Sequence, residues 1–499
     1  ELADALKLLR EQWDAGTASW DAANPLTIWV ADGTYLPLYD AAEGDYTLDG
    51  GRDNAFVMVE HVNILGGFSG DEDPQSFDLS TRDFEVNETI LTGDLNGDDQ
   101  VTNDDGNLTL ANRSDNVAHV VIGAFDDAEA YVRLDGVTVM GGSADGSGEI
   151  YLVNGQQVSI DIGGGVYIER GNFYLANSII TQNSSSNVGG GIFGSNASLT
   201  LENTKVMQNR SSFGGGLSIN NGSDAVLIGV VVASNEASAS GGGLTVFNSD
   251  VQILNATFYG NRANEGGGIQ VIESQSVDIA NSIFRENDNS SDQNSSGSDI
   301  FNSEGTISVN YSLTQTWDTG TGNIVGADPQ FSDPAESDYT LTNISPAINA
   351  GDPATDLSMF PGGPDNPVDL AGNPRVFAGE ADIIDMGAYE FQGEPDVSVS
   401  IDGNGDHDEL LPKRISLSQN FPNPFNPSTN IQFELPQTSQ VVLEVYDMVG
   451  RRVATLVNEQ VTTGSHTVTF DAGSLASGVY TYRLVAGGTT FTRQLTLIK

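Results

Sequence analysis

An internal repeat with a period near 26 residues runs through the middle of the chain. Glycine triplets recur at spacings of 26, 25, 27 and 25 residues, beginning at Gly163, Gly189, Gly214, Gly241 and Gly266. Asparagine recurs at a constant spacing of 26 residues, at Asn183, Asn209, Asn235, Asn261 and Asn287. A period of this length is typical of solenoids, in which each repeat buries its apolar face only against its neighbours.

Each repeat contains three short stretches in which apolar residues alternate with other residues. In the fourth repeat the alternating pairs are Leu244 with Val246, Val251 with Ile253, and Ala256 with Phe258. Alternation with period two turns one side chain inward and the next outward, which predicts three short strands per repeat. Three strands and three bends close one coil, so equivalent residues of successive coils are expected to lie about 4.8 Å apart in parallel sheets.

Stacked coils explain the repeated polar residues without any activity. Amides at equivalent positions can hydrogen-bond from coil to coil, both in the first asparagine column and in a second one at Asn177, Asn203, Asn255 and Asn281, where Gly229 fills the missing place. A third column alternates in charge, at Arg210, Glu236, Arg262 and Asp288. The glycine triplets supply a bend that needs positive φ or a close backbone approach.

Regions outside the repeats complete the expected organisation. Residues 2–13 predict a short amphipathic helix that caps the stack, and residues 27–35 predict the first strand and turn. Coils between about residues 57 and 142 are expected to be irregular with acidic insertions, and residues 311–391 to form a less regular terminal cap. Residues 393–410 read as a linker. From residue 411 the strands are long and alternating, which is typical of a compact antiparallel sandwich.

Charge and composition exclude several classes of function. The formal net charge of −50 comes from 69 acidic and 19 basic side chains, so we expect no nucleic-acid partner and no binding to anionic lipid headgroups. Residues 411–499 carry seven basic and five acidic side chains, a net charge of +2, which leaves −52 on residues 1–410. The chain has no Cys, which excludes disulfides and thiolate metal sites. No apolar run reaches the length of a transmembrane segment, and an exported chain is expected to have lost its signal peptide before Glu1.

The sequence therefore predicts an all-β chain in which residues 1–392 form a right-handed parallel β-helix (solenoid) with an N-terminal capping helix. A linker at 393–410 and a small C-terminal antiparallel β-sandwich at 411–499 are expected to follow. The repeat GGG-[apolar] followed by [FIV]-x-x-N resembles the polymorphic outer-membrane protein repeats of bacterial extracellular β-helix proteins. The segments IWVADGTYLP, LGGFSGDE, TILTGDLNGDD, SPAINAGDP and DMGAYEF also look like such proteins, and together they cover most of residues 27–392.

The C-terminal stretch NFPNPFNPSTNIQFELP, followed by VYDMVGRRVATL and GVYTYRL, closely resembles the sorting domain of type IX secretion. The resemblance covers residues 420–499. It implies an Ig-like β-sandwich, engagement of the type IX secretion machinery and transport across an outer membrane. Cleavage of the domain, followed by release or attachment to surface lipopolysaccharide, is the usual outcome for such chains. We therefore expect a secreted protein at the cell surface, on the outer membrane exterior, or in the extracellular space.

One acidic segment has the spacing of a calcium loop. In DLNGDDQVTNDD, the side chains of Asp94, Asn96, Asp98 and Asp105 occupy positions 1, 3, 5 and 12 of an EF-hand-like loop, with the carbonyl of Gln100 at position 7. The loop resembles dockerin-type calcium loops, but Asp stands where Gly normally permits the turn and Asp rather than Glu ends it. Two interpretations stay open, a Ca²⁺ site or a solvated acidic loop between coils. A shorter run at residues 402–408 lacks the closing acid.

No catalytic constellation stands out, so no catalytic or cofactor-binding residue is assigned. His61 and His119 have neither metal-ligand spacing nor a nucleophile motif, and carboxylates are too abundant for any pair to be specific. We favour a non-enzymatic surface protein for adhesion or for contact with extracellular polysaccharide or matrix, because a solenoid presents long regular faces. The alternative is a polysaccharide lyase or glycoside hydrolase that acts in a groove of the β-helix.

Overall fold

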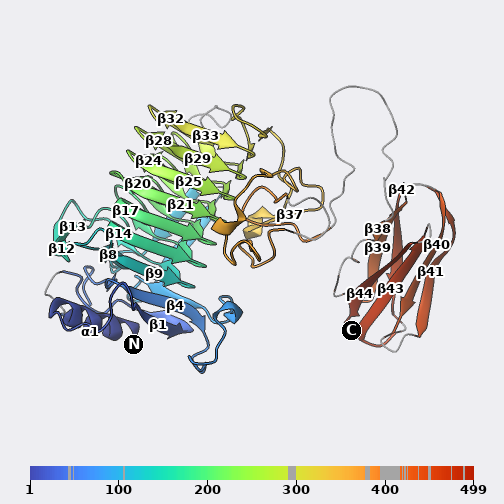
Figure 1. The fold of residues 1–499 in the computed structure, drawn as a ribbon, viewed down its shortest axis with the longest axis horizontal. Coiled ribbons are helices and arrows are strands. Elements are labelled where there is room, and N and C mark those ends of the chain that lie inside the picture. Colours follow the sequence, from blue (N-terminus) through green and yellow to red (C-terminus); the bar gives the residue numbers. More distant parts are fainter. Residues whose placement is uncertain are drawn as a thin grey trace. The chain divides into compact units, whose positions relative to one another are not determined.

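A computed structural model describes residues 1–42, 47–48, 50–104, 107–289, 299–376, 383–393, 416–417, 420, 423, 425–435, 438–447, 451–462, 464–473, 475–486 and 489–498. The chain divides into two compact units, Glu1–Gln392 and Gly393–Lys499 (Figure 1). Most of the predicted linker, from residue 394 to residue 410, lies outside the described residues.

The first unit is built from three parallel sheets whose strands come from successive repeats. In the described residues the largest sheet has 15 strands and is called the first sheet. Its strands are β1 (Leu26–Ala31), β3 (Phe56–Val57), β4 (Val62–Phe68), β8 (Val121–Ala124), β9 (Tyr131–Asp135), β14 (Val166–Ala176), β17 (Ile192–Glu202), β20 (Leu217–Asn220), β21 (Asp224–Ile228), β24 (Leu244–Phe247), β25 (Asp250–Leu254), β28 (Ile269–Ile272), β29 (Val277–Ala280), β32 (Ile300–Ser303) and β33 (Ile307–Asn310).

The second sheet contains β2 (Gly33–Tyr35), β5 (Thr89–Thr92), β10 (Thr138–Met140), β15 (Ile179–Thr181), β18 (Lys205–Met207), β22 (Val231–Ala233), β26 (Thr257–Tyr259), β30 (Ile283–Arg285), β34 (Leu313–Thr314) and β35 (Ile324–Val325). The third sheet contains β11 (Ser143–Ala144), β16 (Ser184–Ser185), β19 (Arg210–Phe213), β23 (Glu236–Ser240), β27 (Arg262–Ala263) and β31 (Asp288–Asn289). The predicted all-β chain with stacked parallel strands is confirmed. The first two alternating stretches of a repeat share the first sheet, and the charged column marks a short extra strand in the third.

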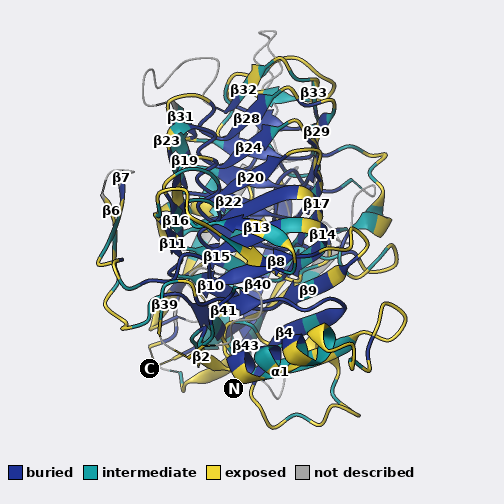
Figure 2. Cartoon of the chain, turned by 90° about the vertical axis from the view of Figure 1, so that its left-hand side faces the viewer, coloured by how far each residue is buried: buried dark blue, intermediate teal, exposed yellow. Residues whose placement is uncertain are grey.

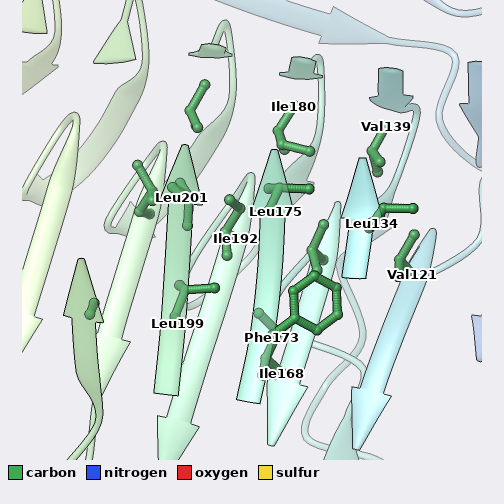
Figure 3. Packing of buried hydrophobic residues seen from close by; sticks show 14 of the residues in the cluster. Val121, Leu134, Val139, Ile168, Phe173, Leu175, Ile180, Ile192, Leu199 and Leu201 are labelled. Carbon is green, nitrogen blue, oxygen red and sulfur yellow. The ribbon is translucent and has the colours of Figure 1, made fainter. Parts of the chain in front are cut away.

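Inward side chains form continuous apolar columns. One column in the first sheet runs through nine rungs in exact register, at Ile28, Ile64, Leu134, Leu175, Leu201, Leu227, Ile253, Ile279 and Val309. Figure 3 shows Leu134, Leu175 and Leu201 of this column beside Val139 and Ile180 of the second sheet. All five side chains are fully buried. Burial of each such side chain contributes about 1.5 to 3 kcal/mol, so the core grows with every coil.

The first asparagine column is a hydrogen-bonded ladder, as predicted. From Asn183 to Asn261, each residue donates its backbone N–H and its Nδ2 to the Oδ1 of the asparagine 26 residues later, at 2.9–3.2 Å. All five asparagines are buried. At the end of the ladder, Nδ2 of Asn287 donates to Oδ1 of Asp299 at 3.2 Å, and burial raises the pKa of Asp299 to about 6. The ladder thus pairs polar groups that the corner of each coil takes away from water.

The glycine triplets stack on each other at a neighbouring corner. The first glycine of each triplet has φ between 62° and 71°, where a β-carbon is strained. The third glycine lies against the backbone of the next coil, because a β-carbon on Gly165, Gly191, Gly216 or Gly243 would come within 2.5–2.6 Å of a glycine carbonyl oxygen there. Both reasons predicted for glycine therefore apply, each at its own position in the triplet.

The second asparagine column forms corners rather than a complete ladder. Asn177, Asn203, Asn255 and Asn281 have φ of 45–51°, and Gly229 has φ of 63°. Only one rung joins two of these amides, since Nδ2 of Asn281 donates to Oδ1 of Asn255 at 3.2 Å. The other amides bond elsewhere, and asparagine suits these corners because it tolerates the left-handed region.

The charged column and the N-terminal helix lie where the sequence predicts them. Arg210 and Glu236 form an ion pair at 3.6 Å, and Arg262 and Asp288 form one at 3.8 Å, all on the outward side of the third sheet. Helix α1 (Leu2–Asp14) buries Leu2, Ala3 and Leu6 against the apolar core, and Leu9 and Trp13 pack at its margin. At the other end of the core, Trp317 packs against the last coils.

Residues 331–376 and 383–391, called the flank segment, differ from the expected terminal cap. They carry β36 (Phe331–Asp333), η2 (Pro334–Glu336), β37 (Asp338–Leu341) and η3 (Leu357–Met359), and they lie along the side of the stack (Figure 1). Phe360 and Ile384 pack on Ile228 and Leu254, which are outward residues of the first sheet. The flank segment thus covers the outward apolar residues Ile228 and Leu254. The alternating pattern of the strands did not predict this cover.

Buried polar groups hold the flank segment in place. Asn203 Nδ2 donates to the Asp369 carbonyl at 3.1 Å, and Asn255 Nδ2 donates to the Asp385 carbonyl at 2.7 Å. Arg375, which is fully buried, donates to the backbone carbonyl groups of residues 387 and 388. Burial and the charge of Asp385 raise the pKa of Glu390 to about 9, because the Arg375 charge only partly offsets them. Glu390 is therefore protonated at neutral pH.

The second unit is antiparallel. Strands β38 (Ser416–Leu417), β39 (Ser428–Leu435) and β42 (Gly464–Asp471) form one sheet, and β41 (Arg452–Val461), β40 (Ser439–Tyr446), β43 (Gly478–Ala486) and β44 (Thr489–Leu497) form the other. Phe433 and Phe470 of one sheet share a buried core with Leu443, Tyr482 and Leu484 of the other. Two sheets packed in this way form a sandwich.

Removal of one ladder amide tests the stacking energetically. Asn235→Ala removes the acceptor of the Asn209 backbone N–H, one of the acceptors of the Asn209 Nδ2 and a donor to the Val206 carbonyl. We therefore expect the free energy of unfolding to fall by about 2 to 4 kcal/mol. Gln252→Ala, at an exposed position of β25, is the control and should change it by less than about 0.5 kcal/mol. Urea unfolding of both variants measures the difference, and equal midpoints would contradict the ladder's role.

The buried Glu390 carboxyl makes stability depend on pH. Its pKa is about 9 in the folded chain against an ordinary value of 4.5, so folding binds a proton between these values and stability falls as pH rises through them. We expect Glu390→Gln to flatten the fall in melting temperature between about pH 5 and pH 9. The exposed Glu265→Gln variant should follow the wild-type curve. A Glu390→Gln curve parallel to the wild type would contradict the assignment.

Candidate metal centre

The acidic segment at residues 94–116 is an insertion that contains a β-hairpin. Strands β6 (Gln100–Asp104) and β7 (Asn107–Ala111) pair antiparallel, from Gln100 opposite Ala111 to Asp104 opposite Asn107. Residues 94–99 lead into the hairpin and residues 112–116 lead out of it. Because the two strands pair, both of these short segments meet at the root of the hairpin.

Three carboxylates gather at this root. Single ligand oxygens of Asp94, Asp98 and Asp115 all lie within 4.8 Å of one another, and these three form the one group of three or more metal-ligating side chains found in the described residues. Oδ1 of Asp94 accepts the N–H of Gly97 at 2.7 Å, and its Oδ2 accepts the N–H of Asp99 at 3.1 Å. The backbone thereby folds around the Asp94 side chain, as it does at anion-stabilised turns.

The structure brings together two of the five predicted ligands. Asp94 and Asp98 belong to the cluster, and Asn96 is exposed between them. Gln100 begins strand β6 and pairs there with the opposite strand. Asp105 lies outside the described residues, as does the acidic run at 402–408.

Asp115 was missed by sequence reasoning. It stands outside the EF-hand-like spacing and reaches the cluster only because the hairpin turns the chain back. The signal was available in two stretches of similar length, QVTND and NLTLA, on either side of a central DG pair. A DG pair between two such stretches favours a hairpin, and a hairpin places residues after it next to residues before it.

Asp99 and Arg113 anchor the root to the stack. Nη2 of Arg113 lies 3.3 Å from Oδ2 of Asp99, and each side chain is only 8% exposed. Arg113 also donates to the carbonyl of Gly142 at 3.0 Å and to the carbonyl of Gln182. Burial raises the pKa of Asp99, and the Asn116 amide and Arg113 partly offset this, while the charges of Asp94 and Asp115 add to it.

The body of the hairpin lies across the charged column. The N–H of Leu108 donates to Oε2 of Glu236 at 3.0 Å, and Nη1 of Arg210 donates to the Leu108 carbonyl at 3.3 Å. Leu108 is 2% exposed. Figure 2 shows β6 and β7 running along the stack beside β19 and β23. The hairpin therefore works as a strap that links coils remote from its root.

The two histidines singled out from the sequence do not join this centre. Nδ1 of His119 lies 2.8 Å from the carbonyl oxygen of Gly163, and burial lowers the pKa of His119 to about 4. The imidazole is thus neutral at physiological pH. His61 stacks edge to face with Trp13, with ring centroids 6.0 Å apart. Both are packed residues of the first unit.

Comparison with known families assigns the second unit. Residues 419–499 match the secretion system C-terminal sorting domain. These residues include both sheets of the second unit except β38, so the resemblance seen in the sequence is confirmed. The sorting domain engages the type IX secretion machinery, and the protein is exported to the cell surface or the extracellular space.

No curated protein and no solved structure matches the chain. Among the described residues, no helix has the length and apolar character needed to span a membrane.

Deletion of residues 411–499 tests the sorting assignment. We expect the truncated chain to stay inside the outer membrane, because the signal that the secretion machinery recognises lies in the deleted residues. Cell fractionation and immunoblotting measure this, with the full chain as control. Recovery of equal amounts of truncated and full chain on the cell exterior would contradict the assignment.

Proposed function

We infer that the first unit is a right-handed parallel β-helix, akin to polymorphic outer-membrane protein repeats, and that it makes non-enzymatic contacts outside the cell. Its partners are extracellular polysaccharide or matrix. Surface lipopolysaccharide is the proposed attachment point once the sorting domain has acted. The observation that carries this function is a regular polar face on the first sheet.

Two outward columns make up this polar face. One column runs through Tyr131, Asn172, Ser198, Asp224 and Asp250. The other runs through Arg133, Tyr174, Thr200, Val226, Gln252, Asp278 and Ser308, in which Val226 is the apolar member and packs beside the flank segment. Equivalent positions repeat about every 4.8 Å and most of them carry a hydrogen-bonding side chain, so an extended polymer can meet polar groups on several successive coils.

Aromatic side chains lie at the N-terminal end of this face. Tyr131 is 36% exposed, and the Arg133 guanidinium lies 4.6 Å from the ring centroid of Tyr174. The hydroxyl of Tyr174 donates to Glu202. Aromatic faces beside polar groups suit sugar rings, which have apolar faces and hydroxyl edges.

The same cluster is poorly suited to base catalysis. Burial and the hydrogen bond to Glu202 raise the pKa of Tyr174 well above its usual range, so this phenol is a weak source of phenolate at neutral pH. Arg133 is bound to the buried carboxylate of Asp135 at 2.5 Å. Tyr174 and Arg133 therefore interact with each other and with neighbouring carboxylates, and this arrangement favours a contact function over catalysis.

Binding to insoluble polysaccharides tests the contact function. We expect the full chain to bind at least one of a panel of acidic and neutral polysaccharides, and Tyr131→Ser to bind it roughly threefold to tenfold more weakly because an exposed ring is lost. Phe213→Ser is the matched control, since Phe213 is 40% exposed and belongs to the third sheet.

The outcomes separate contact from catalysis. Equal binding by the Tyr131→Ser and Phe213→Ser variants would contradict the proposed face. Unsaturated products or new reducing ends during incubation would overturn the non-enzymatic function and favour a lyase or a hydrolase.

A further inference from the structure

We propose that Asp94, Asp98 and Asp115 hold one Ca²⁺ ion, and that this ion closes the root of the β6–β7 hairpin and keeps the hairpin docked on the charged column. The ligands come from both sides of the hairpin, because Asp94 and Asp98 precede β6 and Asp115 follows β7. The centre differs from an EF-hand loop, in which one continuous segment supplies the ligands. It does not depend on the contact function proposed above.

The cluster carries negative charge that the nearest arginine, Arg113, offsets only from its ion pair with Asp99. In the described part of the chain, neither lysine nor arginine forms an ion pair with Asp94, Asp98 or Asp115, and Arg113 pairs instead with Asp99. Three carboxylates whose oxygens lie within 4.8 Å of one another carry like charges that repel. A divalent cation among them replaces this repulsion with attraction.

Buried acceptor oxygens without donors provide a second, independent observation. Oδ1 of Asp99, Oδ2 of Asp115 and Oδ1 of Asn116 are buried, and no described residue donates a hydrogen bond to them. Asn116 is fully buried and donates its Nδ2 to Oδ2 of Asp99 at 2.9 Å. Asp99 follows Asp98 in the chain, and its backbone N–H donates to Oδ2 of Asp94 at 3.1 Å, so its side chain lies at the edge of the cluster. Unsatisfied buried acceptors are rare in folded proteins, and a cation satisfies acceptors where a donor is missing.

The donor set selects the kind of ion. Every ligand of the cluster is a carboxylate oxygen, and no histidine or cysteine is part of it. Hard oxygen donors of this kind favour Ca²⁺ or Mg²⁺ over zinc or copper. Ca²⁺ accepts flexible coordination by six to eight oxygens, and Mg²⁺ requires a near-ideal octahedron. Ligands from two chain segments of a loop root suit the more tolerant ion.

The position of the ion gives it a mechanical role. Docking of the strap depends on Leu108, whose N–H and carbonyl bond to Glu236 and Arg210. Carboxylates that repel each other at the root push the two ends of the hairpin apart. Ca²⁺ joins the two ends, so its binding favours the conformation in which the strap crosses several coils.

Titration with Ca²⁺ and hydrogen exchange, both on the full chain, test the site and the strap separately. We expect calorimetry to show one Ca²⁺ per chain when the ion is titrated up to roughly 10 mM. The Asp115→Asn variant should bind Ca²⁺ at least about tenfold more weakly than the wild type. Asp224→Asn, at an exposed position of β21, is the matched control and should bind as the wild type does. Ca²⁺ should slow exchange of the Leu108 amide about tenfold in the wild type but not in Asp115→Asn.

The other possible results would overturn the metal site, the role of the strap or the choice of ion. No heat from the wild type, or equal heats from wild type and Asp115→Asn, would overturn the metal site. Tight binding with unchanged exchange at Leu108 would overturn the strap and leave the site in place. As a control for folding, the circular dichroism spectrum of Asp115→Asn should match that of the wild type. Titration of the wild type with Mg²⁺ tests the choice of ion, and a larger heat for Mg²⁺ than for Ca²⁺ would overturn it.

Discussion

The buried asparagine ladder fixes the register on which the rest of the stack depends. Alternation of apolar residues decides which side of a strand faces inward, but a shift by two residues preserves that alternation. The ladder removes this freedom, because each Oδ1 accepts two donors from the preceding coil and each Nδ2 also donates to a backbone carbonyl. A shifted coil would separate each Oδ1 from its two donors and each Nδ2 from the carbonyl of the preceding coil. The loss of these buried hydrogen bonds would cost several kcal/mol.

Segments that do not repeat tie the repeats together from outside. The flank segment bonds to the amides of Asn203 and Asn255, and the hairpin strap bonds to the charged column at Glu236. Both cross several coils, whereas contacts between repeats reach only the adjacent coil. One of these segments buries the protonated carboxyl group of Glu390. The other begins at the carboxylate cluster of Asp94, for which we propose a bound Ca²⁺ ion.

Most of the stack could be predicted from the sequence because its physics is local and periodic. The ladder from Asn183 to Asn287, the charged column and the capping helix follow from spacing alone. The flank segment could not be predicted, since its contact with Ile228 joins residues far apart in sequence. Asp115 was missed for the same reason, because only pairing of the hairpin brings it to Asp94.

Disulfide formation between introduced cysteines tests the column register most directly, since the chain has no Cys of its own. Gln252 and Asp278 are partners on adjacent coils, about 4.8 Å apart, which is within the range that a disulfide spans. We predict that the double variant Gln252→Cys, Asp278→Cys forms a disulfide rapidly. The double variant Gln252→Cys, Ser276→Cys should form none, because the Cα atoms of residues 252 and 276 are about 8 Å apart. Equal oxidation of both pairs, or of the offset pair alone, would contradict stacked columns.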